Sequence, residues 1–170
     1  MEFRKNDIVT LEIVDCGTDG EGIGKADGFT VFVKDAVIGD TVTAKIMKAK
    51  KNYGYGRLME ILNASPYRVE PVCPSARQCG GCQLQAVSYE EQKVFKEKKL
   101  RGHLERIGGF TNLPMEPLIG MDEPYHYRNK AQFPVGRNKE GKIVTGFYAG
   151  RTHAIIENRD CALGIPENKD

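Results

Sequence analysis

Apolar and polar residues alternate along the first sixty residues in short runs that are separated by glycine. The segments "DIVTLEIVDCG", "GFTVFVKDAVIGD", "TVTAKIMKAKK" and "GYGRLMEIL" are rich in the β-branched and aromatic residues that favour strands. In the second segment, Val31 and Val33 fall on the side opposite to Phe32. The tripeptides "ADG" and "IGD" are expected to form turns. About five short strands with glycine corners predict a small OB-like β-barrel over residues 1–63.

The rest of the chain changes pattern twice. A proline-rich linker, "NASPYRVEPVCP", is followed by "SYEEQKVFKEKKLRGHLERIGG", which predicts one clear helix with Ser88 and Glu91 in a capping-box pattern. After residue 120, "YHYRNKAQFPVG", "KIVTGFYAG" and "THAIIENRDCALG" predict a small antiparallel sheet. The fold class is therefore expected to be mainly β with one helix. The expected domains are 1–63 (barrel), 64–120 (cysteine segment and helix) and 121–170 (antiparallel β domain).

Composition indicates an ordinary soluble chain. Its 170 residues are 40% hydrophobic and 28% charged, with a formal net charge of +2. Charges begin at Glu2, and neither a signal-peptide core nor a run long enough to span a membrane follows. We expect a cytoplasmic monomer with no membrane attachment, in which thiols stay reduced and disulfides are disfavoured.

Cysteines supply the strongest chemical signal. Cys73, Cys79 and Cys82 lie within "VCPSARQCGGCQLQ", and Cys161 lies far downstream in "NRDCALG". Four thiolates at one point favour zinc or an iron–sulfur cluster, and the three-plus-one spacing alone leaves both open. A thioredoxin-like pair would need a βαβ unit, which is not predicted here. Unrelated buried cysteines are the remaining alternative, and Cys16 is interpreted as a small packed residue.

A glycine-rich segment, "DGEGIGK", imitates a nucleotide-binding loop. Such a loop follows a strand and opens a helix. This segment leads instead through "ADG" into "FTVFV", another predicted strand. Its glycines are therefore expected to shape a turn of the barrel, and no S-adenosylmethionine site is predicted there.

Two basic stretches interleave cations with aromatic or amide side chains. Cations neutralise phosphates, and tyrosine rings stack on unpaired bases, so both stretches suggest RNA binding. The simpler alternatives are a solvated hairpin for the first stretch and an ordinary exposed sheet face for the second. The candidate RNA-binding residues are Lys45, Lys48, Lys50, Lys51, Tyr53 and Arg57 in the first stretch, and Arg128, Lys130 and Gln132 in the second.

Three segments together resemble the uracil-C5 RNA methyltransferases that carry a TRAM domain and an iron–sulfur cluster. "GEGIGKADGFTVFVKDAVIGDTV" is similar to the TRAM signature, and "CPSARQCGGCQLQAVSYEEQKVFKEKKL" to the cluster segment with its helix. "YRNKAQFPVG" with "GFYAGRTHAIIENRDC" is similar to the central β domain, which ends in the fourth cluster cysteine. The resemblance spans essentially the whole chain. It implies a 4Fe-4S cluster on the four cysteines named above.

The same resemblance implies a division of labour. Members of this family continue into a Rossmann-like domain, which binds S-adenosylmethionine and carries the cysteine that attacks C6 of the uracil. Nothing in this sequence matches that domain. We therefore expect the RNA-recognition half of the enzyme, truncated and inactive alone, with no catalytic residue. Large-subunit ribosomal RNA is the expected substrate, ahead of transfer RNA. A standalone RNA-binding module with zinc or a cluster, and a small iron–sulfur redox protein, stay open.

Overall fold

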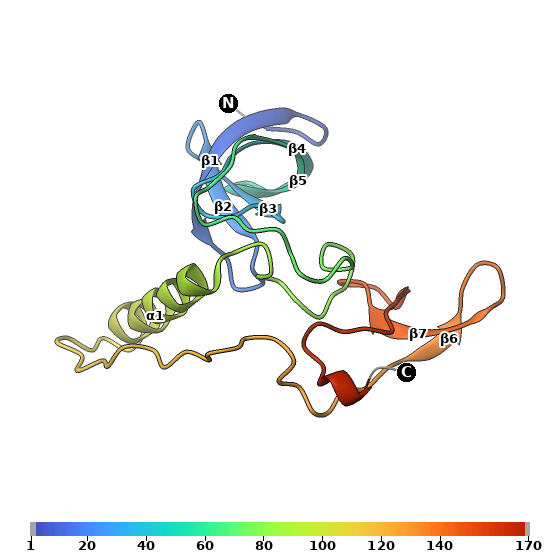
Figure 1. The fold of residues 1–170 in the computed structure, drawn as a ribbon. Coiled ribbons are helices and arrows are strands. Elements are labelled where there is room, and N and C mark those ends of the chain that lie inside the picture. Colours follow the sequence, from blue (N-terminus) through green and yellow to red (C-terminus); the bar gives the residue numbers. More distant parts are fainter. Residues whose placement is uncertain (1–2, 169–170) are drawn as a thin grey trace. The chain divides into compact units, whose positions relative to one another are not determined.

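A computed structural model describes residues 3–168, and the chain divides into two compact units (Figure 1). Unit 1 comprises Met1–Glu70 with Ala86–Ser88, and unit 2 comprises Pro71–Gln85 with Tyr89–Asp170. Within residues 3–168 the elements are β1 (Ile8–Cys16), β2 (Gly22–Ala26), β3 (Phe29–Lys34), β4 (Thr41–Ala49), β5 (Tyr53–Asn63), α1 (Tyr89–Arg106), β6 (Val135–Arg137), β7 (Ile143–Tyr148), β8 (Ile155–Glu157) and the 3-10 helix η1 (Pro166–Asn168). The expected fold class, mainly β with one helix in this range, is confirmed. The domain boundaries at residues 63 and 120 stay a prediction.

Unit 1 is a closed barrel with strand order β1-β2-β3-β5-β4 (Figure 1, blue to teal). Neighbouring strands are antiparallel, except that β3 and β5 pair in parallel. Val31 and Val33 are fully buried on β3, whereas Phe32 between them stays partly exposed. This alternation confirms the prediction and shows how a two-residue period fills the barrel from inside. The buried core consists of Val9, Leu11, Ile13, Val31, Val33, Ala36, Val42, Ala44 and Ile46.

The glycine-rich segment contributes a strand as well as the expected turn. Residues 22–26 form β2, which pairs with β1 and β3, and the backbone N–H of Gly17 donates to Glu21 O at 2.7 Å in the turn before it. A Cβ atom at Gly24 would lie 2.4 Å from the carbonyl oxygen of Glu12, so glycine is required by close packing between strands. The segment therefore joins two strands and opens no helix.

A buried ion pair fastens the start of the linker to the barrel within unit 1. Asp40 is fully buried, and its carboxylate accepts hydrogen bonds from the backbone N–H groups of Val37 (2.7 Å) and Ser65 (2.9 Å). Arg68 donates two more, at 3.1 and 2.5 Å. Burial raises the pKa of Asp40, but the hydrogen bonds from Arg68, Ser65 and Val37 outweigh it and hold this pKa below 3.8.

Unit 2 pairs a small sheet with an exposed helix. Its strands lie in the order β6-β7-β8, all antiparallel, and a turn at residues 138–141 joins β6 to β7 as predicted. No residue of α1 is buried, over its whole described length. The buried apolar side chains of this unit, among the described residues, are Cys73, Cys79, Val144 and Ala162. Half of this small core is thus cysteine.

The strand predicted over residues 125–136 is wrong for most of its length. Only Val135–Arg137 is a strand, and residues 125–134 run without regular structure apart from an isolated bridge between Arg128 and Gly164. Arg128, Lys130 and Gln132 therefore do not share the face of a strand.

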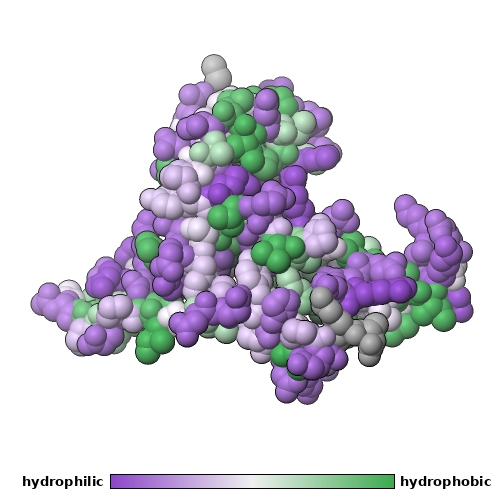
Figure 2. Space-filling model, in the orientation of Figure 1, coloured by the Kyte–Doolittle hydropathy of each residue, from purple (hydrophilic) through white to green (hydrophobic). Residues whose placement is uncertain are grey.

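Hydrophobic side chains also reach the surface of the barrel. Figure 2 shows green patches among purple on the side of the barrel that faces the viewer. No helix within residues 3–168 is both long enough and apolar enough to cross a lipid bilayer. The exposed large side chains of unit 1 include Ile8, Val14, Met47, Tyr53, Met59 and Leu62.

Candidate functional site: a four-cysteine pocket

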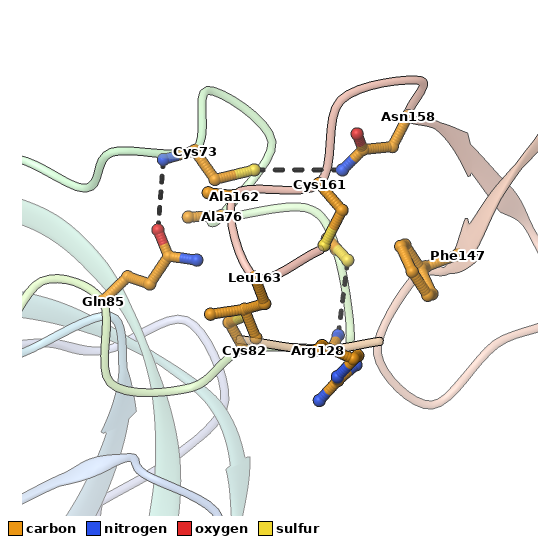
Figure 3. Close-up of a pocket in the computed structure, with 12 residues that line it drawn as sticks. Cys73, Ala76, Cys82, Gln85, Arg128, Phe147, Asn158, Cys161, Ala162 and Leu163 are labelled. Atoms are coloured by element: carbon orange, nitrogen blue, oxygen red, sulfur yellow. Dashed lines mark hydrogen bonds between the residues drawn. The ribbon is translucent and has the colours of Figure 1, made fainter. Parts of the chain in front are cut away.

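One pocket of unit 2 brings together the four cysteines that the sequence singled out (Figure 3). It encloses about 340 Å³, including its open mouth. Cys73 and Cys79 are buried, and Cys82 and Cys161 are partly exposed. Cys16, on β1 of the other unit, does not line this pocket. The other lining residues are Ala76, Gly81, Gln85, Arg128, Phe147, Asn158, Ala162 and Leu163.

The C-x-x-C loop is held against the end of β7 by its backbone. Cys79 forms a bridge with Ala149, and the N–H of Gly80 donates to Tyr148 O at 2.9 Å. A Cβ atom at Gly80 would lie 2.8 Å from that same carbonyl oxygen, so a larger residue would push the loop away. The N–H of Gly81 donates to Cys79 Sγ at 3.3 Å. Backbone donors to sulfur are typical of thiolates that bind metal.

Two amide side chains hold Cys73, and no pattern in the sequence marks either of them. Gln85 Oε1 accepts from the N–H of Cys73 at 3.1 Å, and Asn158 Nδ2 lies 3.9 Å from Cys73 Sγ (Figure 3). Asn158 also accepts from the N–H of Asp160 at 3.0 Å, which shapes the turn before Cys161. The run "NRDC" signals that turn in the sequence, but the contact with Cys73 depends on folding.

The last cysteine is placed by a pairing between two distant segments. His126 and Arg128 donate backbone N–H bonds to Ala162 O (3.0 Å) and Leu163 O (2.7 Å). The N–H of Ile165 returns to Arg128 O at 3.2 Å. This ladder holds Cys161 at the pocket and brings the Arg128 side chain to its wall (Figure 3). Arg128, grouped with the RNA contacts on sequence, thus lies beside the thiols.

The chemistry of the donor set fits a group that binds thiolates. Burial raises the pKa of Cys82, a hydrogen bond with Gln85 opposes this, and the neighbouring thiols Cys161, Cys79 and Cys73 raise it further. Several thiolates crowded in one pocket need a positive partner, and a metal or cluster supplies one. Within residues 3–168, no three Cys, His, Asp or Glu side chains gather closely enough for one metal ion.

The first group of predicted RNA contacts lies on unit 1, at strands β4 and β5 and the hairpin between them. Lys45 and Arg57 are direct cross-strand partners, and so are Lys48 and Tyr55. Lys50 and Lys51 follow β4 and are exposed. In unit 2, Lys130 and Gln132 are exposed outside any strand. An RNA role for all these residues stays a prediction.

Comparison with known proteins agrees with this architecture. A model of the TRAM domain matches residues 3–59, which are the closed barrel up to the middle of β5. Residues 3–59 are a TRAM domain. The barrel core of unit 1 therefore belongs to the TRAM domain, and the Asp40–Arg68 pair joins this domain to the linker that follows it.

Similarity extends past the TRAM domain over almost the whole chain. An uncharacterized RNA methyltransferase of Halalkalibacterium halodurans is 48% identical over 165 residues, which are 97% of this chain and 36% of that protein. One from Clostridium tetani is 48% identical over 160 residues, 94% of this chain and 34% of that protein. The chain thus spans about a third of the length of these relatives.

A solved structure shares the fold. The Pyrococcus abyssi tRNA (uracil-54, C5)-methyltransferase, in complex with S-adenosyl-L-homocysteine, aligns with a TM-score of 0.58 at 22% identity. The alignment covers 94% of this chain and 34% of that one. The shared fold therefore includes segments of both units.

Proposed function

We propose that this chain is the RNA-recognition part of an S-adenosylmethionine-dependent RNA (uracil-C5-)-methyltransferase. The observation that carries the proposal is the 48% identity to an RNA methyltransferase over 97% of the chain, TRAM domain and cysteine segments included. Large-subunit ribosomal RNA is the proposed substrate, as the family resemblance implies, in a cytoplasmic monomer. Transfer RNA, the substrate named for the structural neighbour, is the alternative.

We further propose that Cys73, Cys79, Cys82 and Cys161 hold a 4Fe-4S cluster. The shared pocket and the donors to two of its sulfur atoms support this. A tetrahedral zinc ion with Zn–S bonds of about 2.3 Å needs its sulfur atoms about 4 Å apart. No three Cys, His, Asp or Glu side chains in residues 3–168 are placed closely enough to hold a metal ion, so the cluster is proposed on the shared pocket and the family resemblance, with zinc as the alternative.

The residues of this chain have a positioning role in the proposed reaction. When bound, the cluster supplies a cross-link between the segments of Cys79 and Cys161 and no electron transfer, because methyl transfer involves no redox step. Gln85 and Asn158 orient Cys73, and Arg128 lines the same pocket. The barrel binds RNA through its cations and rings. The nucleophile and the methyl donor are implied by the resemblance to belong to a Rossmann-like domain.

Deleting the gene that encodes this chain is expected to remove one C5-methyluridine from large-subunit ribosomal RNA. Mass spectrometry of digested ribosomal and transfer RNA, before and after complementation, measures this directly. Loss from transfer RNA instead would overturn the proposed substrate. An unchanged set of methylated uridines would contradict the proposed methyltransferase activity and favour an RNA-binding module without enzyme activity.

Residues 1–170 alone are expected neither to bind S-adenosylmethionine nor to methylate RNA. The glycine-rich segment joins β1 to β2 and then β3, and it lacks the strand-to-helix geometry that binds such cofactors. Isothermal calorimetry with S-adenosylmethionine checks the expectation. A micromolar dissociation constant would contradict it and return residues 19–25 to consideration.

A further inference from the structure

Three aromatic rings touch one another on the outside of the barrel, at strands β3 and β5. The ring centroid of Phe32 lies 5.8 Å from that of Tyr53 and 5.6 Å from that of Tyr55, and the centroids of the two tyrosine rings lie 5.8 Å apart. The parallel pairing sets Thr30 beside Tyr53 and Phe32 beside Tyr55. The alternate residues of both strands, such as Val31 and Gly54, are buried. We name Phe32, Tyr53 and Tyr55 the ring cluster.

The ring cluster is not part of the hydrophobic core. Tyr53 is 38% exposed, and Phe32 and Tyr55 are each partly exposed. Gly54 and Gly56, the inward neighbours on β5, leave no room for a side chain, because a Cβ at Gly56 would lie 3.1 Å from both Ala44 Cβ and Val31 Cγ1. The inside of this wall is closed by core residues, so the three ring side chains lie on the outer surface of the barrel.

Cations frame the ring cluster on the neighbouring strands. Lys48 lies opposite Tyr55 across the β4–β5 pair. Two residues after Tyr55 on β5, Arg57 lies between Lys34 on β3 and Lys45 on β4. In the described strands, no Asp or Glu occupies these registered outward positions. The outward positions form three rows of cross-strand partners. The first row contains Lys25, Thr30 and Tyr53, the second Ile23, Phe32, Tyr55 and Lys48, and the third Lys34, Arg57 and Lys45.

We propose that the ring cluster stacks unpaired RNA bases while Lys45, Lys48 and Arg57 hold the adjoining phosphates. Exposed rings accept any base face, and flanking cations neutralise the backbone, which is the combination that binds single strands. Duplex RNA hides its base faces within the helix, so an unpaired segment is the ligand. This inference rests on the proposed RNA-methyltransferase function and identifies an unpaired segment as the part of the RNA that the TRAM domain binds.

A single introduced tryptophan tests base stacking. The chain contains no tryptophan, so Tyr55→Trp provides one indole within the ring cluster. Titration of the 170-residue protein with single-stranded decauridine is expected to quench this indole, whereas inorganic polyphosphate of equal charge leaves it unchanged. Tyr67→Trp is the matched control, since Tyr67 is exposed and lies outside the ring cluster. Equal quenching by polyphosphate, or none by decauridine, overturns the stacking.

Affinity measurements separate stacking from charge. Tyr53→Ala is expected to weaken decauridine binding about 5- to 150-fold without changing the salt slope, the range for one lost base–ring contact. Replacing Lys45, Lys48 and Arg57 together by Ala is expected to weaken binding and flatten the salt slope by about two. Thermal melting verifies that each variant is folded. Unchanged affinity of folded Tyr53→Ala overturns the inference.

Failure of this inference is distinguishable from failure of the proposed function. If gene deletion removes a C5-methyluridine but decauridine leaves the indole unchanged, the stacking surface is wrong and the enzyme stands. If decauridine quenches the indole but deletion alters no methylated uridine, the surface stands and the enzyme is wrong.

Discussion

The Cys161→Ser protein, purified without oxygen, is expected to lack iron and sulfide, whereas the wild type is expected to be brown and to contain both. Removing one thiolate leaves Cys73, Cys79 and Cys82, which lie close together in sequence and cannot close the pocket from both sides. Cys161 is carried there by the ladder to His126 and Arg128. Serine keeps the shape of the side chain but is a poor ligand for soft metals.

Loss of the cluster is expected to loosen unit 2 on both sides of the pocket. The buried apolar residues of that unit, in the described chain, are few and include Cys73 and Cys79. Ligand binding by such a site contributes folding free energy directly. Hydrogen exchange in residues 71–85 and 155–165 is therefore expected to accelerate together in Cys161→Ser, while strands β1–β5 keep their protection.

Cys16→Ser is the control for this experiment, because Cys16 lies on β1 and does not line the pocket. It is expected to retain full iron and sulfide. Stoichiometric zinc without iron in fresh anaerobic wild type would contradict the proposed cluster. Full iron in Cys161→Ser would contradict the assignment of that ligand.

Arg68→Met is expected to destabilise the TRAM domain by about 3 kcal/mol, the lower end of the range for breaking a buried ion pair. Asp40 is fully buried, so removing the guanidinium leaves a carboxylate with hydrogen bonds from Val37 and Ser65 only. Those two bonds keep the loss from being larger. Urea unfolding, followed by hydrogen exchange of barrel peptides, measures it. Arg57→Met is the control, since Arg57 is exposed and surface charges contribute little.

The difference between wild type and Arg68→Met is expected to shrink in acid. In the wild type, the pKa of Asp40 is held below its unfolded value of 3.8. Its contribution is therefore complete above pH 3.8 and is lost as pH falls through the lower, folded pKa. Without Arg68 the folded pKa rises, and this contribution is smaller from the start. A difference that stays constant from pH 6 to pH 3 would show that Asp40 and Arg68 are not coupled.

Sequence patterns predicted the barrel well where side-chain alternation and turn residues agreed. Val31 and Val33 point inward on β3 as expected, between the turns at "ADG" and "IGD". Residues 19–25 were expected to shape a turn of the barrel, but Gly22 and Gly24 lie in β2. In the structure, close contact with β1 requires both glycines, so packing overrides propensity.

The strand expected over 125–136 shows the opposite limit. Its aromatic and cationic alternation is strand-like, but Arg128 pairs with Gly164 through one bridge and Pro134 lacks a donor for a longer ladder. The cysteines were visible from spacing alone. Gln85 and Asn158 were not, because the atoms that they contact come together only on folding.

Closure of the barrel also decides how another molecule can attach to it. Each of β1 to β5 is hydrogen-bonded to two neighbours, so the described barrel has no strand edge on which an extended peptide could add. Strand addition, and the sheet-to-sheet growth that leads to fibrils, both need such an edge. Substitutions on the outer surface of the barrel can therefore change which ligand it binds, while its backbone stays closed to strand addition. That property suits it for transfer into other proteins as a self-contained module.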